Sequence, residues 1–76
     1  MTPSELKSIR TMLGITTDAL ATVLGVSGGR TVRRWEAGDR TIPGPAAVLL
    51  LAIKESAAVR AHLGLTGPQE AQPKAA

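Results

Sequence analysis

Cysteine is absent from this 76-residue chain, and Trp35 is its only aromatic residue. Without cysteine there can be no disulfides or thiolate metal ligands, and nothing favours an oxidising compartment. Apolar runs fall far short of the roughly 20 residues that span a bilayer. Residues 1–5 also lack the basic region and apolar core of a signal peptide. We therefore expect a cytoplasmic protein with no membrane association and a core of aliphatic side chains.

Patterns that support catalysis or metal binding are missing as well. His62 is the only histidine, and no metal-ligand spacing is present. None of the serines has a base in a recognisable catalytic arrangement. The glycine-rich residues 25–29 lack the strand and lysine of a nucleotide-binding loop. We expect no enzyme activity, cofactor, metal or small-molecule effector, and the length allows one small domain.

Positive charge is the feature that stands out. The chain has nine Lys and Arg against six Asp and Glu, for a net charge of +3. Four of the six arginines lie between residues 30 and 40, opposed there only by Glu36 and Asp39. A clustered basic patch predicts a polyanionic partner. The alternative is a solvated charged face without a partner.

Residues 30–36 predict how this charge is presented. At about 100° per residue in a helix, Arg30, Arg33 and Arg34 fall within an arc of roughly 100°. Val32 and Trp35 fall on the opposite side. Such a helix has an arginine edge and an apolar back, which suits contacts to phosphates and guanine edges. Trp35 could instead stack on a base, but its place beside Val32 favours core packing.

Capping residues and apolar spacing predict an all-α fold with four helices. Thr2 and Glu5 form a capping box at the start of the first helix, and glycines end the first and second helices. The expected helices cover about residues 3–13, 16 or 17 to 24, 29–37 and 45–63. Residues 64–76 hold two prolines and no apolar periodicity, so we expect a disordered tail after a domain of residues 1–63.

The predicted fourth helix, a long one, is apolar on nearly every side. One stripe is enough to join the core, and a helix apolar all round needs a second partner. We expect a homodimer whose interface is formed by residues on the remaining faces, namely Leu50, Leu51, Ala47 and Ala58. The alternative is that these residues are simply exposed.

Two charged residues lie where apolar ones are expected. Arg10 is on the apolar side of the first helix, and Glu36 is on the apolar side of the third. An isolated buried charge is costly, so we predict a salt bridge between them. The alternative is that both side chains reach solvent from the edges of their helices.

Three segments together resemble the Cro/CI-type helix-turn-helix domain, also called lambda-repressor-like or XRE. Residues 9–16 (IRTMLGIT) resemble its first helix, 20–27 (LATVLGVS) its second helix and turn, and 31–38 (TVRRWEAG) its recognition helix with the W-E-x-G ending. The match covers about the first two-thirds of the chain. It implies a compact domain whose second helix crosses the DNA backbone while the third enters the major groove. A salt bridge like Arg10–Glu36 is also typical of the family.

The resemblance also implies which residues meet DNA. Arg30 and Arg34 would read bases, and Arg33 would contact a base or a phosphate. Phosphate contacts are expected from the start of the second helix, the turn and the loop after the third helix: Thr17, Ser27, Gly28, Gly29, Thr31 and Arg40. The turn is one residue longer than usual. Either the recognition helix begins late, or backbone N–H groups there bind a phosphate.

The implied function is sequence-specific transcriptional regulation. A dimer would bind double-stranded DNA at a near-palindromic operator, acting as a repressor on the nucleoid. A chain without an effector domain is similar to phage-type repressors, including the autorepressors found beside anti-CRISPR genes, and to antitoxins. The rival hypothesis is an antitoxin-like interaction module that covers a partner protein with its last helix or tail. The tail has few apolar anchors, which favours the regulator.

Overall fold

The computed structural model describes residues 1–65; the rest of the predicted tail lies outside the described residues. The described part contains five α-helices and no strand: α1 Pro3–Leu13, α2 Thr17–Leu24, α3 Gly29–Glu36, α4 Gly44–Glu55 and α5 Ala57–His62. This confirms the all-α prediction. None of these helices combines the length and apolar character that crossing a bilayer demands.

The capping box predicted at the start of α1 is present. The Thr2 hydroxyl accepts from the Glu5 backbone N–H at 3.1 Å, and Glu5 Oε1 accepts from the Thr2 N–H at 2.8 Å. The backbone hydrogen bond from Thr2 holds the pKa of Glu5 below its ordinary value, because it favours the ionised carboxylate. Two N–H groups that a helix start leaves unpaired are thereby satisfied.

The ends of α1 and α2 also follow local signals. Thr16 caps α2 by accepting the Ala19 N–H at 3.0 Å. Gly14 and Gly25 terminate α1 and α2 with φ values of 68° and 73°. A side chain is strained in this left-handed region, whereas glycine is not. The predicted boundaries of the first two helices are therefore confirmed, and α3 spans Gly29–Glu36, one residue shorter than predicted.

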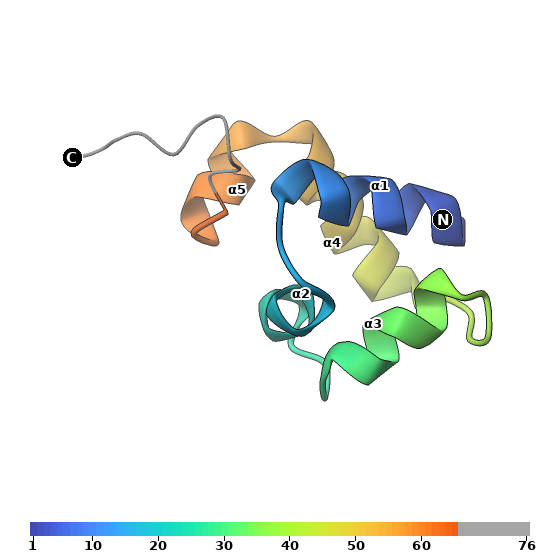
Figure 1. Cartoon of the computed structure of the whole chain (residues 1–76). Helices are drawn as coiled ribbons and strands as arrows, with labels where there is room; N and C mark the ends of the chain where they lie inside the picture. Colours follow the sequence, from blue (N-terminus) through green and yellow to red (C-terminus); the bar gives the residue numbers. More distant parts are fainter. Residues whose placement is uncertain (66–76) are drawn as a thin grey trace.

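One core joins all the helices except α5, which adds residues at its edge. In Figure 1, α1 lies at the upper right, α3 forms the lower edge, and α2 is seen nearly end-on beside the start of α3. Trp35 is the only aromatic contribution to an otherwise aliphatic interior. The buried residues are Leu6, Ile9, Leu13, Leu20, Ala21, Val32, Trp35, Ile42, Leu50, Ile53 and Leu65.

The prediction of a single long helix from Pro45 to about residue 63 is wrong. The chain breaks at Ser56, whose backbone is extended, with φ −126° and ψ 115°. The Ser56 hydroxyl then accepts the Val59 N–H at 3.2 Å and caps α5. A serine is among the best residues for starting a new helix. The break lets Val59 and Leu63 pack against the core.

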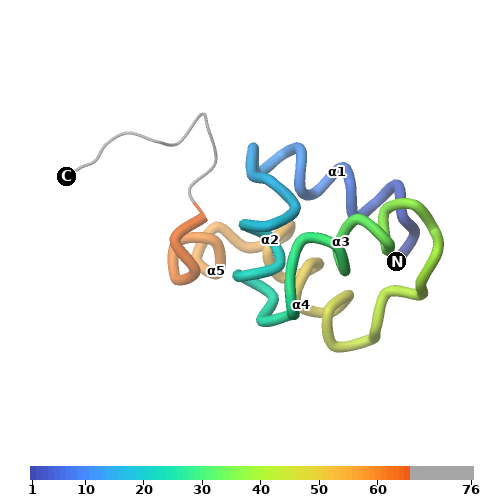
Figure 2. Tube along the Cα trace, turned by 60° about the horizontal axis from the view of Figure 1, so that its bottom comes forward, coloured from blue at the N-terminus to red at the C-terminus, as the bar shows by residue number. Residues whose placement is uncertain are grey.

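Arg60 stabilises the break between α4 and α5. Its Nη1 donates to the backbone oxygens of Ile53 at 2.8 Å and Lys54 at 3.0 Å. These carbonyls lie at the end of α4, where helical partners run out. Both Figure 1 and Figure 2 show α5 folded beside the end of α4 instead of continuing it.

The domain extends beyond the predicted boundary at residue 63. Gly64 has a φ of 76°, and the Leu65 N–H donates to the Arg60 carbonyl at 2.7 Å. Leu65 is only 7% exposed and belongs to the core. A left-handed glycine followed by an apolar contact is a common helix ending. Gly64 and Leu65 are therefore part of the fold and not of a tail.

The predicted dimer face also needs correction. Leu50 is completely buried and packs in the core with Ile53, so it cannot contact a second chain. Leu51 is 43% exposed, while Ala47 is half-buried. Ala58 is exposed but lies on α5, beyond the break. The four residues do not form one exposed face, because Leu50 lies in the core and the break separates Ala58 from the other three.

Candidate nucleic-acid interface

The helix α3 separates its charged and apolar residues as predicted. Val32 is completely buried and Trp35 is 3% exposed. Arg30, Arg33 and Arg34 are all exposed. Residues three and four apart lie on one side of a helix, so the three arginines form a common exposed edge of α3. Figure 1 shows α3 at the lower edge of the molecule. The packed indole is not available to stack on a base.

The predicted pair of Arg10 and Glu36 is present and joins α1 to α3. Nε of Arg10 donates to Oε2 of Glu36 at 2.6 Å, and Nη2 donates to Oε1 at 3.1 Å. The remaining Nη1 donates to the Ile15 carbonyl at 3.1 Å. The hydrogen bond with Glu36 raises the pKa of Arg10 above its ordinary value. The side chains are 20% and 11% exposed, so water reaches the pair only partly.

This pair has an electrostatic consequence for α3. Glu36 is the only acidic residue of the helix. Its carboxylate is bound by Arg10 on the inner side. A neutralised carboxylate turned toward α1 repels an approaching anion much less than a free one on the outer side. The exposed edge of α3 is left with positive side chains.

The starts of α2 and α3 approach each other closely. The Gly29 N–H donates to Asp18 Oδ1 at 3.0 Å, and Arg33 Nη1 donates to the Thr17 hydroxyl at 2.9 Å. A Cβ at position 29 would overlap Asp18 Oδ1 and lie 2.9 Å from Thr17 Oγ1. Only glycine fits this contact without a shift of backbone or side chain. Figure 2, turned so that the lower side comes forward, shows α2 and α3 adjacent.

These contacts correct the role predicted for Gly29. Its N–H is already bound by a carboxylate, and the residue is buried, so it does not offer an amide to a phosphate. The residue before the helix is Gly28, which is extended and supplies no side-chain cap. Helix α3 begins at Gly29 and not later. Ser27 and Thr31 lie together across the turn, with hydroxyl oxygens 3.2 Å apart.

Asp18 is a site residue that was not predicted. A signal for it does exist in the sequence, because Gly28 cannot cap α3 with a side chain. The first N–H groups of a helix need acceptors from elsewhere. What the sequence does not show is which acceptor lies nearby, since Asp18 is eleven residues away and comes from another helix.

Arg40 lies beyond the far end of α3. It is exposed in the loop that follows the helix, which Figure 1 shows beside the N-terminus. A small hollow of about 210 Å³ there is lined by Met1, Pro3, Gly38, Arg40, Thr41 and Ile42. The arginine edge of α3 thus has Thr17 of α2 beside it, bound to Arg33, and Arg40 past the end of the helix.

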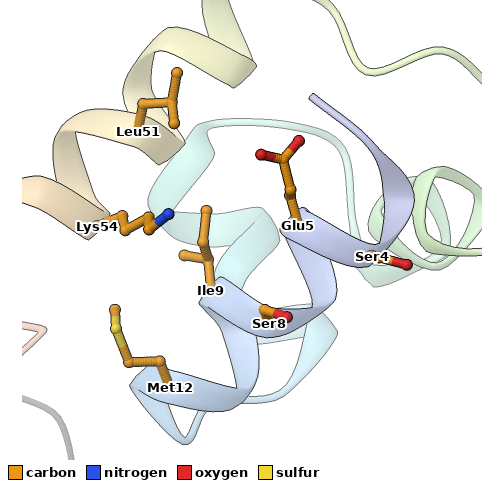
Figure 3. A pocket seen from close by; sticks show the side chains of 7 residues that line it. All are labelled: Ser4, Glu5, Ser8, Ile9, Met12, Leu51 and Lys54. Carbon is orange, nitrogen blue, oxygen red and sulfur yellow. The ribbon is translucent and has the colours of Figure 1, made fainter.

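A second surface feature is a groove between α1 and α4, shown in Figure 3. It has a volume of about 310 Å³. Met12 is 39% exposed and Leu51 is 43% exposed at its sides. No residue of α2 or α3 contributes to the lining, which consists of Ser4, Glu5, Ser8, Ile9, Met12, Leu51 and Lys54.

Comparison with known proteins adds no assignment. No protein-family model matches the chain, and no curated protein matches it significantly. Within residues 1–65, no three His, Cys, Asp or Glu side chains are grouped so that they could hold a metal ion. The functional conclusion therefore depends on the geometry and charge of the surfaces described above.

Proposed function

We propose that the protein is a sequence-specific DNA-binding regulator that inserts α3 into the major groove. The observation that carries this proposal is the exposed arginine edge of α3, anchored from behind by the buried Trp35. The major groove accommodates an α-helix, and arginine is the side chain most often used to read guanine. The resemblance to Cro/CI-type domains and the close packing of α2 on α3 support the same assignment.

The three arginines take different roles in this proposal. Arg30 and Arg34 lie one helical turn apart on the exposed edge and read base edges. Arg33 is turned back toward α2 and is held by Thr17. A guanidinium and a hydroxyl at the start of a helix suit a phosphate, which fixes position without reading sequence. We therefore assign Arg33, with Thr17, to the DNA backbone.

The remaining phosphate contacts lie on either side of this pair. Arg40 reaches the backbone beyond the end of α3. Near its start, the turn supplies the Ser27 hydroxyl and the Gly28 amide, and the first turn of α3 supplies the Thr31 hydroxyl. Contacts at both ends of the recognition helix hold it in register along the groove. Each phosphate neutralised also makes binding more sensitive to salt.

Dimerisation is part of the same proposal. On α4, Val48 is 69% exposed and Leu51 is 43% exposed, three residues apart on one side. Exposed apolar residues that adjoin one another favour an interface. Two copies would place two α3 helices about 34 Å apart, one turn of DNA, on a near-palindromic operator. Occupation of such a site on the nucleoid would block transcription, which makes the protein a repressor.

Selection from a random DNA pool, followed by titration, tests the proposal. We expect an enriched motif with two-fold symmetry. On that motif Arg34→Ala should weaken binding by about 5- to 150-fold, the loss of one bidentate contact, with a much smaller loss on random DNA. Lys7→Ala removes an exposed charge from α1 and serves as the control. Absence of a motif, or equal losses on both DNAs, would refute base reading by α3.

The groove between α1 and α4 favours a second candidate function, an antitoxin-like module that binds a partner protein. Met12 and Leu51 would provide its apolar contacts. Products of neighbouring genes are the natural partners to test by co-purification. This function predicts that Leu51→Glu abolishes partner binding and leaves DNA binding in place. If Leu51→Glu instead weakens operator binding by preventing dimer formation, the face belongs to the regulator.

A further inference from the structure

The start of α3 is capped by a side chain from another helix. The residue before α3 is Gly28, which has no side chain to offer. Asp18, in the first turn of α2, accepts the Gly29 N–H at 3.0 Å. That N–H is one of the groups a helix start leaves without an internal acceptor, and a carboxylate there is also favoured by the helix dipole.

A second bond runs parallel to this cap. Thr17 and Asp18 are neighbours on α2, while Gly29 and Arg33 lie one turn apart on α3. Two bonds attach α3 to α2 at two points along its length. The core packing of Val32 and Trp35 holds α3 from behind, and the two bonds to α2 further restrict its direction and rotation. Gly29 makes the approach possible, because a Cβ there would overlap the Asp18 carboxylate.

We infer that Asp18 is a positioning residue that sets the angle at which α3 presents Arg30 and Arg34 to DNA. The inference depends on the proposed function. Helix α2 carries Thr17 toward the phosphate backbone, and Asp18 fixes α3 relative to that anchor. Hydrogen bonds to base edges tolerate only a few tenths of an ångström, while contacts to phosphates tolerate more. Losing the cap should therefore reduce discrimination more than general affinity.

A purely electrostatic role for Asp18 predicts the opposite effect on DNA binding. Asp18 is exposed beside a surface proposed to meet phosphates. If it acted only through its charge, its removal would tighten binding to every DNA. Asp18→Asn keeps an acceptor oxygen and removes the charge, whereas Asp18→Ala removes both. Asp39→Ala deletes an exposed carboxylate from the loop after α3 and leaves the cap untouched, so it is the matched control.

The test compares Kd on the selected operator with Kd on random duplex DNA at two salt concentrations. For Asp18→Ala we expect the ratio of the two to fall by about tenfold, similar to the loss of one good cap. Random DNA should bind as well as before or slightly better. Asp18→Asn and Asp39→Ala should keep most of the ratio. Equal effects of Asp18→Asn and Asp18→Ala, or an equal loss on both DNAs, would overturn the inference.

Amide hydrogen exchange tests the cap without DNA, so it shows whether the cap or the proposed DNA-binding function is at fault. With Asp18 as acceptor, the Gly29 amide should exchange slowly for a residue at a helix start. In Asp18→Ala we expect it to exchange at least about tenfold faster, with Asp18→Asn between the two. Unchanged exchange in Asp18→Ala means that there is no cap. A confirmed cap in a protein that prefers no DNA sequence refutes the proposed function and, with it, the role assigned to Asp18.

Discussion

The first three helices and the last two differ in how their positions are specified. Each of α1 and α2 begins at a threonine cap and ends at a glycine. Charged residues then restrict which side of each helix can face inward. The segment from Pro45 to Leu63 contains no glycine and is apolar on several sides. Its fold is decided by Ser56 and Arg60, whose contacts are made across a break in the helix.

The comparison shows that polarity, more than apolar content, makes a helix predictable. Arg10 and Glu36 occupy otherwise apolar faces. Burying either charge without its partner costs so much free energy that few packing arrangements of α1 and α3 are allowed. Leu49, Leu50 and Leu51 point in three directions and are chemically alike. Any of them could face the core. Only the tertiary structure selects Leu50, and this is why the predicted dimer face is wrong.

The largest effect on stability should come from truncating the buried Leu50, compared with truncating its exposed neighbour Leu51. We expect Leu50→Ala to lower the free energy of unfolding by about 2–5 kcal/mol, because it leaves a cavity in the core. Leu51→Ala, at the surface, should change it by about 0.5 kcal/mol or less. Urea unfolding of both variants measures the difference. Similar losses would mean that Leu51 is packed as tightly as Leu50, which would contradict the orientation of α4 in the structure.

The next effect concerns the Arg10–Glu36 pair. Arg10→Met strands the Glu36 carboxylate, and we expect a loss of about 2–3 kcal/mol, below the range for complete burial because some water reaches the pair. Glu36→Gln should cost a similar amount. The double variant Arg10→Met with Glu36→Leu should recover part of the stability. Single variants that melt at the same temperature as the parent would show that the pair does not help to fix α1 against α3.

Some features of this fold can be predicted from the sequence and others cannot. The capping box of α1, the inner face of α3 and the Arg10–Glu36 pair all follow from residues whose requirements are local or chemically unusual. The cap from Asp18, the break at Ser56 and the burial of Leu65 do not. Asp18 and Gly29 are eleven residues apart and meet only after folding. Ser56 caps α5 locally, but the break there and the burial of Leu65 depend on how the residues after the break pack against the core. The glycine at position 28 signals a missing cap but not its replacement.

A smaller effect should follow from removing the cap of α5. Ser56→Ala leaves the Val59 N–H without its acceptor and also favours continuation of α4. We expect a loss of about 1 kcal/mol, typical of an N-cap. Thr16→Ala, at the start of α2, is the matched control and should cost a similar amount. If Ser56→Ala is neutral or stabilising, then Arg60 and the packing of α5 specify the break without the serine.

The smallest effect is the pH dependence contributed by Glu5. Its pKa is lowered in the folded protein by the Thr2 backbone hydrogen bond, from a reference value of 4.5. A lowered pKa contributes stability that is present above the unfolded value and is lost as pH falls through the folded one. Glu5→Gln can keep the hydrogen bond but has no charge to lose. Melting curves from pH 7 to pH 3 should therefore show a small advantage of the parent that closes in the acidic range. If the parent is more stable than the variant by the same amount at every pH, protonation of Glu5 does not affect folding. The start of α1 is then stabilised by its neutral hydrogen bonds alone.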